Sequence, residues 1–297
     1  MTMTQSAGSV VGLWRFPVKS MRGERVPQSD LTGQGLVGDR AYALIDSASG
    51  KVVSAKSVRE YPNLLACRAS FVEPPGFGRE LPAVCIELPD GTKVLSDSDN
   101  TDRVLSAWFR REVTLARTAP EDFTIDQYYP DVEDIDPAGH CNTTVEQKLG
   151  SAFFAEAGLD SPVQVGRFFD LFPLSMLTTS ALARLNELQP KSRFDERRFR
   201  MNVIVDTAEG GFVENGWVDR TVSIGENVRL RVALPDPRCV MTTLPQEELP
   251  GDNDVLRGLA RHNRLQVGEA GRFPCMGVYA VVQASGTIRI GDRVTVN

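Results

Sequence analysis

The segment TVSIGENVRLRV, residues 221–232, alternates apolar and polar side chains on both sides of a glycine turn. A second segment of the same design, GTIRIGDRVTV, occupies residues 286–296. Alternation with a period of two places one set of side chains on a buried face and the other set in solvent. Both segments therefore predict β-hairpins that belong to a barrel with a filled interior.

The rest of the chain carries more strand signals than helix signals. Strands or hairpins are predicted at residues 10–18, 41–45, 51–53, 85–95 and 203–205. Helices are predicted at 97–111, at 254–262 and after the capping residues Thr178, Thr179 and Ser180, up to Pro190. No regular alternation of strands and helices is visible. The pattern predicts a mostly β (α+β) fold, with two β-barrel-like domains and peripheral helices.

A change of composition divides the chain. Residues 119–140 hold seven acidic residues and no Lys or Arg, together with three prolines. A calcium loop would need a glycine and a terminal glutamate at positions where this stretch has neither. We therefore expect an N-terminal domain over residues 8–120, an acidic connection over 121–142 and a second domain over 143–297.

Charge and cysteine content exclude several classes of protein. The 33 Lys and Arg against 39 Asp and Glu give a net charge of −6, which argues against nucleic acid or an anionic membrane as a partner. No apolar run approaches the ~18 residues of a membrane span, and the first residues do not form a secretory signal. The five cysteines form no C-x-x-C pair, so neither a disulfide framework nor a zinc ribbon is expected. These features predict a cytoplasmic protein.

Most catalytic motifs are absent. Residues 33–38, GQGLVG, match the dinucleotide fingerprint G-x-G-x-x-G, but a strand pattern follows where that motif must open a helix. We interpret these glycines as turn residues. The sequence has no P-loop, no G-x-S-x-G and no H-E-x-x-H, and its two histidines are isolated.

One cysteine has an unusual setting. Cys239, in LPDPRCVMTTL, follows a proline-stiffened turn and an adjacent Arg238, a neighbour that favours the thiolate form that binds soft metals. Short basic motifs recur elsewhere, at FPVKS (16–20), GDR (38–40) and RFRMN (198–202). Lys and Arg beside Ser and Asn are the residues that an anionic ligand with amide edges needs.

Six segments in order resemble the MOSC superfamily, in its form with a MOSC N-terminal β-barrel domain followed by the MOSC domain. They are FPVKS, GLVGDR (35–40), TTSALARLNEL (178–188), RRFRMNVIV (197–205), PRCVMTTL (237–244) and GVYAVVQASGTIRIGDRV (277–294). Within that superfamily, the sequence is similar to the mitochondrial amidoxime-reducing components and their bacterial counterparts. The resemblance extends over roughly residues 8–296.

The resemblance implies a molybdenum cofactor, Mo-molybdopterin, and a set of residues around it. Cys239 matches the cysteine that ligates molybdenum and is thus the implied catalytic and metal-binding residue. The positions implied to bind the cofactor are Lys19, Ser20, Arg40, Thr178, Thr179, Arg200, Asn202, Arg238 and Tyr279.

The resemblance also implies an activity and partners. The expected activity is reduction of small N-hydroxylated or N-oxygenated compounds by oxygen-atom transfer. Neither the membrane anchor nor the appended ferredoxin-like domain of some relatives is visible here, so a separate iron–sulfur, haem or flavin protein is expected to supply electrons. Two alternatives remain open: a carrier that holds the cofactor without turnover, and a sulfur carrier with a persulfide on Cys239.

Overall fold

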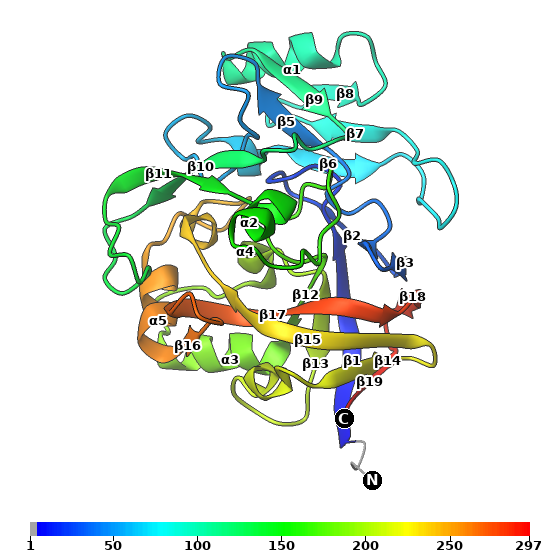
Figure 1. Ribbon diagram of the computed structural model, residues 1–297, viewed down its shortest axis with the longest axis vertical. Helices are drawn as coiled ribbons and strands as arrows, with labels where there is room; N and C mark the ends of the chain where they lie inside the picture. Colours follow the sequence, from blue (N-terminus) through cyan, green and yellow to red (C-terminus); the bar gives the residue numbers. More distant parts are fainter. Residues whose placement is uncertain (1–4) are drawn as a thin grey trace.

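The computed structural model describes residues 5–297. A β-rich upper part built from residues of the first half lies above a barrel built mainly from the second half (Figure 1). Strands are the main element in both parts, and the five α-helices of the described residues are short. The predicted mostly β fold is confirmed.

The barrel consists of seven strands that close on themselves. In barrel order they are β12 (Leu174–Thr178), β13 (Val203–Asp206), β1 (Gln5–Arg15), β19 (Arg293–Val296), β14 (Thr221–Ile224), β15 (Val228–Pro237) and β17 (Arg272–Ala284), which pairs back with β12. Only the β12–β13 pairing is parallel. The inward side chains, among them Val222, Leu230 and Val294, are fully buried in one apolar core, as the two-residue alternation predicts.

The hairpin predicted at residues 221–232 is confirmed, and the one at 286–296 is wrong. β14 and β15 pair directly across the Gly225 turn. In contrast, β18 (Gly286–Arg289) pairs with β3 (Gln28–Thr32), whereas β19 pairs with β1 and β14. Alternation identifies a strand and its buried face but does not select its partner, and here the first strand of the chain fills the place between β13 and β19.

The upper part is made of small sheets around a core of its own. Its pairings are β5 (Ala43–Asp46) with β9 (Val113–Ala116), and β6 (Arg68–Phe71) with β7 (Val84–Glu87) and β8 (Lys93–Leu95). By contrast, β3, which pairs with β4 (Gly35–Leu36) and β18, contributes Leu31 to the barrel core, and β2 (Glu24–Arg25) pairs with β1. The strand predicted at 51–53 is reduced to one bridge between Ile45 and Val52. Residues 33–34 and 37–38 form turns on either side of β4, and a Cβ added at Gly38 (φ +85°) would lie 2.5 Å from the Phe71 ring.

Three of the helices pack on the outside of the two parts, and the two shortest lie between the parts, where their residues line a cavity (Figure 1). They are α1 (Thr101–Phe109), α2 (Gly150–Glu156), α3 (Thr179–Leu188), α4 (Glu196–Phe199) and α5 (Asp254–His262), with 3₁₀ turns η1 (Leu64–Ala66), η2 (Val213–Trp217) and η3 (Val240–Thr243). α3 begins as predicted, because the Thr178 side chain accepts a hydrogen bond from the Ala181 amide. Leu185 of α3 and Leu259 of α5 pack in one apolar cluster against the barrel.

A two-stranded sheet occupies the acidic region between the two halves. β10 (Thr124–Tyr129) pairs with β11 (Thr143–Lys148), and Ile125, Gln127 and Tyr129 on one face of β10 are buried. The short β16 (Arg264–Gln266) pairs with β17 nearby in the lower part. Because β1 belongs to the lower barrel, the first strand of the chain crosses from one half to the other. The domain limits at residues 120 and 142 stay a prediction.

Candidate functional site

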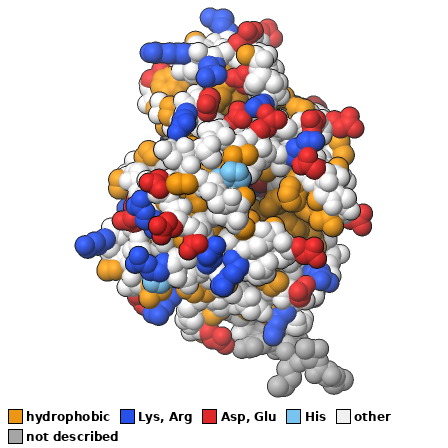
Figure 2. All heavy atoms as spheres, turned by 60° about the vertical axis from the view of Figure 1, so that its left-hand side comes forward, with side chains coloured by type: hydrophobic (Ala, Val, Ile, Leu, Met, Phe, Trp, Pro, Cys, Tyr) orange, Lys and Arg blue, Asp and Glu red, His pale blue; other side chains and the backbone are white. Residues whose placement is uncertain are grey.

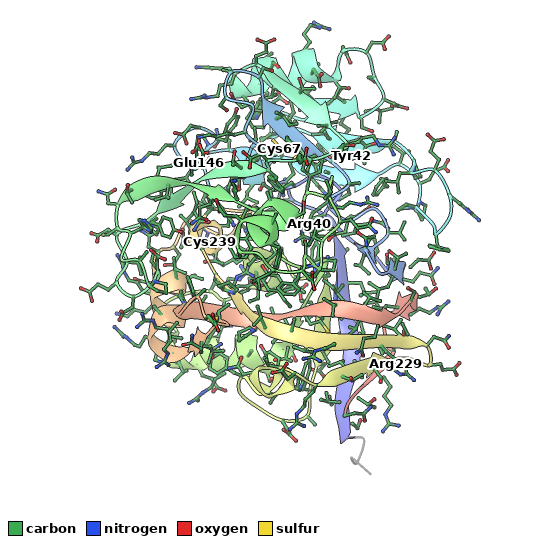
Figure 3. The ribbon with its side chains drawn as sticks, in the orientation of Figure 1. Arg40, Tyr42, Cys67, Glu146, Arg229 and Cys239 are labelled. Atoms are coloured by element: carbon green, nitrogen blue, oxygen red, sulfur yellow. The ribbon has the colours of Figure 1, made fainter. Side chains whose placement is uncertain are left out.

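One cavity of about 1160 Å³ lies where residues of both halves meet. On the face turned forward in Figure 2, hydrophobic side chains gather in a hollow, with acidic side chains around it. Arg40 and Cys239 lie in the zone between the upper and lower parts in Figure 3. Eight of the ten residues expected at the site line this cavity: Lys19, Ser20, Arg40, Arg200, Asn202, Arg238, Cys239 and Tyr279.

Cys239 stands at the junction of β15 and the η3 turn. Its backbone is extended and it occupies the position before the first residue of η3. The thiol is free and half-buried. The other four cysteines do not line the cavity, and Cys67 and Cys275 are fully buried. Cys239 is therefore the one thiol that a ligand in this cavity can reach among residues 5–297.

Two lysines share one carboxylate on the cavity wall. Lys56 Nζ lies 2.7 Å from Asp170 Oδ2, Lys19 pairs with the other oxygen of Asp170, and Lys19 also donates to the Phe168 carbonyl at 3.1 Å. Burial lowers the pKa of Lys19 to about 8. Burial alone would raise the pKa of Asp170, but the two ammonium groups hold it well below its ordinary range. Lys56 and Asp170 were missed by the sequence analysis because neither belongs to a recognisable motif.

Two arginines stack on Phe16 beside these lysines. The guanidinium carbons of Arg200 and Arg40 lie 4.2 and 5.1 Å from the centre of the Phe16 ring. Arg40 pairs with Asp39, and Arg200 donates to the Met21 carbonyl. Burial and then Arg40 lower the pKa of Arg200 to about 9. Repulsion between the buried Arg200 and the partly buried Arg40 is reduced when an anion binds between them.

Backbone strain coincides with this cationic group. Ser20, Arg40 and Arg200 have φ values of 65°, 48° and 55°, a left-handed conformation that non-glycine residues rarely adopt. Such conformations cost about 1–3 kcal/mol each and concentrate at functional sites. Three of them at one cavity indicate that the fold maintains the direction of these side chains against a local penalty.

Asn202 lies in the cavity wall and is hydrogen-bonded to residues behind it. Its Nδ2 donates to Asp39 Oδ2 at 2.9 Å and to the Trp14 carbonyl at 3.2 Å. Its Oδ1 accepts a hydrogen bond from the Ser175 amide at 3.2 Å. Since Asp39 in turn holds Arg40, Asn202 orients the arginine through the carboxylate.

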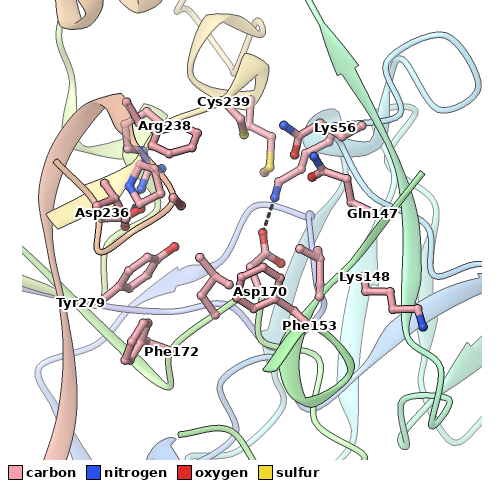
Figure 4. A pocket seen from close by; sticks show the side chains of 18 of the residues that line it. Lys56, Gln147, Lys148, Phe153, Asp170, Phe172, Asp236, Arg238, Cys239 and Tyr279 are labelled. Carbon is pink, nitrogen blue, oxygen red and sulfur yellow. Dashed lines mark ion pairs between the residues drawn. The ribbon is translucent and has the colours of Figure 1, made fainter. Parts of the chain in front are cut away.

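A second charged group lies across the cavity. In Figure 4, Asp236, Arg238 and Tyr279 stand on one side and Lys56 on the other, with Cys239 and Asp170 between them. Arg238 Nη1 lies 2.6 Å from Asp236 Oδ2, and Tyr279 stacks on Phe172 with ring centres 5.2 Å apart. Burial raises the pKa of Asp236 to about 6 against the effect of Arg238. Asp236 is a further residue that the sequence analysis missed.

The inner wall of the cavity, around Cys239, carries more positive than negative charge. Its five cations are Lys19, Arg40, Lys56, Arg200 and Arg238, and their paired carboxylates are Asp39, Asp170 and Asp236, which leaves an excess of two there. At the exposed rim, Glu146, Glu156 and Glu269 outnumber Lys148. In addition, the buried Nε of Arg238 and Oδ1 of Asp236 have no hydrogen-bond partner within residues 5–297. Buried groups of this kind are costly unless a partner arrives. An anionic ligand with hydrogen-bonding edges fits this cavity.

Thr178 and Thr179 do not line the cavity. Thr178 is fully buried and donates to Glu214 Oε2 at 2.6 Å, and Thr179 donates to Asp206 Oδ1 at 2.6 Å. The family resemblance implies that these two residues, at the start of α3, bind the cofactor. In the structure, the Thr178 hydroxyl caps α3 itself and joins it to η2.

Burial of Glu214, the partner of Thr178, leads to a prediction about stability. Glu214 is fully buried, and burial raises its pKa from 4.5 to about 7. The folded state therefore binds this proton more tightly than the unfolded chain does. The resulting stabilisation is complete below pH 4.5 and is lost as the pH rises to 7, by roughly 3 kcal/mol. We expect Glu214→Gln to flatten the fall in unfolding free energy between these pH values, measured by urea titration. Glu187→Gln, on the exposed side of α3, is the control, and an unchanged pH slope in Glu214→Gln would contradict the assignment.

Comparison with known proteins agrees with this architecture. The model of the MOSC N-terminal beta barrel domain matches residues 7–110, and the model of the MOSC domain matches residues 165–295. The chain belongs to the MOSC family and carries both domains. It is 25% identical to mitochondrial amidoxime reducing component 2 of Bos taurus, over 98% of this chain and 83% of that protein. It is 23% identical to mitochondrial amidoxime-reducing component 1 of Homo sapiens, over 98% and 84% respectively.

Among solved structures, the YuaD protein from Bacillus subtilis aligns over 99% of this chain and 98% of its own, with 11% identity and a TM-score of 0.44.

None of the helices within residues 5–297 has the length and apolar character that a membrane span needs. The same residues contain no group of three or more His, Cys, Asp and Glu side chains arranged to hold a metal ion.

Proposed function

We propose that the protein is a molybdenum-cofactor-dependent reductase of small N-hydroxylated or N-oxygenated compounds, with Cys239 as the ligand from the protein to molybdenum. The observation that carries the proposal is a single reachable thiol in a cavity with an excess of buried positive charge. Molybdopterin itself supplies sulfur ligands to the metal and carries a phosphate. The protein therefore needs to supply a thiolate and a cationic pocket rather than a complete ligand set. Family membership and the names of the relatives support the same assignment.

In this proposal, different cavity residues bind different parts of the cofactor. Arg200, Arg40 and Lys19 supply the charge that a phosphate needs, and Ser20 lies beside them with a hydroxyl donor. Arg238 and Asp236 offer a donor and an acceptor to the amide edges of a pterin. Asn202 and Asp39 keep Arg40 in place. Thr178 and Thr179 are left out of the proposed site, because they lie outside the cavity.

When bound, the cofactor supplies the two-electron chemistry that removes the oxygen atom from an N–O bond. Conversion of R–NH–OH to R–NH₂ and water consumes two electrons and two protons. Lys19, with its lowered pKa, and Asp236, with its raised pKa, are the cavity groups able to exchange a proton near neutral pH. We propose that a separate iron–sulfur, haem or flavin protein delivers the electrons and that the reaction takes place in the cytoplasm.

Turnover with a chemical reductant tests this function. Protein produced in a host that makes molybdenum cofactor is mixed with a reduced viologen dye and an N-hydroxylated amidine, and the amidine product is quantified. We expect product formation that depends on both enzyme and reductant. A loaded protein without turnover would favour the cofactor carrier, and a persulfide on Cys239 without metal would favour the sulfur carrier.

A further inference from the structure

Arg198 is a charged side chain that the proposed site does not use, although it is fully buried. It lies on α4, two residues before Arg200, but it does not line the cavity. Its guanidinium donates to four backbone carbonyls: Arg193 at 2.9 Å, Thr242 at 3.2 Å, Leu244 at 3.3 Å and Pro250 at 2.8 Å. No carboxylate within residues 5–297 makes an ion pair with it. A buried cation held by carbonyls alone serves to fix the backbone that supplies them.

Three of these four carbonyls belong to the segment that follows Cys239. Thr242 and Leu244 come from η3 and its end, and Pro250 comes from the loop before α5. This loop also bonds to itself, since the Asp252 amide donates to the Thr243 carbonyl at 2.8 Å. Arg198 therefore lies where segment 242–250 folds around a single guanidinium.

The contacts continue from this segment to Cys239. The amide and the hydroxyl of Thr242 both donate to the Cys239 carbonyl, at 3.2 and 3.0 Å. On the other side of Cys239, Arg238 Nη2 donates to the Phe199 carbonyl at 2.7 Å. Two consecutive residues of α4 thus hold the chain on both sides of the thiol, Arg198 through Thr242 and Phe199 through Arg238.

We propose that Arg198 is a positioning residue that holds Cys239 in the direction required to ligate the metal. The inference rests on the proposed function for its purpose, but its contacts concern the protein alone. Arginine suits the task because a planar fork with five N–H donors reaches several carbonyls at once, whereas lysine offers three donors from one nitrogen.

The adjacent Arg197 provides a matched control. It is partly exposed and pairs with Asp195 at 2.8 Å and with the exposed Glu247 and Glu248 at 2.7 and 2.6 Å. It reaches the same loop as Arg198 through side chains near solvent, where ion pairs contribute little. Replacing either arginine by methionine removes one charge and the same amount of side-chain volume. Of the two changes, the one at Arg198 leaves buried carbonyls without a donor.

The test uses the five cysteines as reporters in metal-free protein. Wild type, Arg198→Met, Arg198→Lys and Arg197→Met are treated with a maleimide, and the labelling rate of each thiol is followed by peptide mass spectrometry. We expect Arg198→Met to raise the Cys239 rate by about tenfold or more, because the loop opens locally. Cys67 and Cys275 should stay protected, Arg198→Lys should restore part of the wild-type rate, and Arg197→Met should stay within about twofold of it.

Two results would overturn the proposal. One is an unchanged Cys239 rate in folded Arg198→Met protein, and the other is a parallel rise at Cys67 and Cys275, which reports general loosening. If Arg198→Met does not fold, hydrogen exchange in Arg198→Lys decides: faster exchange confined to residues 240–250 supports the role, and unchanged exchange there overturns it. Because these measurements need no molybdenum, a wild-type chain that binds none would remove the proposed function and leave the loop contact intact.

Discussion

Cys239→Ser is expected to abolish reduction of N-hydroxylated substrates and to leave the purified protein without molybdenum. A serine hydroxyl is a far poorer ligand for a soft metal than a thiolate. No other cysteine lines the cavity, so none can take over the role. The fold should survive, because Cys239 is half-buried and its side chain makes no hydrogen bond that holds the barrel together. Product formation and metal content, measured on one preparation, check both parts.

Cys141→Ser is the control for this substitution. Cys141 is exposed and outside the cavity, and its thiol donates a hydrogen bond to the Asp131 carboxylate. This variant should match the wild type in turnover and metal content. Full activity in Cys239→Ser would contradict the ligand assignment, and a collapsed thermal transition would show instead that the thiol is structural.

Arg200→Ala is expected to yield folded protein that purifies largely empty of cofactor. The arginine contributes a buried charge over Phe16 and uses only one of its terminal nitrogens, in a bond to the Met21 carbonyl. Loss of a buried charge partner costs roughly 3 kcal/mol, which corresponds to on the order of 100-fold in cofactor affinity. The pterin released on denaturation, measured by its fluorescence per mole of protein, reports the occupancy.

Two further variants test whether the charge alone or the guanidinium fork of Arg200 is needed and whether the effect is specific to the cavity. Arg200→Lys keeps the charge but not the fork, so it should retain an intermediate share of the cofactor. Arg184→Ala removes an exposed arginine of α3 that pairs with Glu187 away from the cavity, and it should stay fully loaded. A fully loaded Arg200→Ala protein would mean that the phosphate is held elsewhere in the cavity.

Site residues that belong to sequence motifs could be predicted, whereas isolated charged residues of the site could not. Residues in recognisable motifs, such as Arg40 and Cys239, converge on the cavity although they lie about 200 positions apart. Lys56 and Asp170 could not be predicted, because a single charged residue in a loop has the same local pattern whether it is exposed or paired in a cavity. Asp236 lies within the LPDPRC segment of β15, but nothing in that pattern shows that its carboxylate is buried against Arg238. Their roles arise only from the burial that the tertiary fold imposes.

Three nearby arginines illustrate the same limit. Arg197, Arg198 and Arg200 lie within four positions of one another, yet one pairs with acids at the surface, one binds four carbonyls and one lines the cavity. Likewise, β18 and β19 have the pattern of a hairpin but pair with different strands. Local alternation and residue type predict which segments are strands, whereas partner choice depends on contacts between distant parts of the chain.

Molybdenum content of the wild-type protein is the most direct test of the account. The protein is made in a cofactor-competent host, purified without added metal and analysed by elemental mass spectrometry, with pterin fluorescence on the same sample. We predict about one molybdenum atom and one pterin per folded chain. Folded protein from that host with neither molybdenum nor pterin would contradict it.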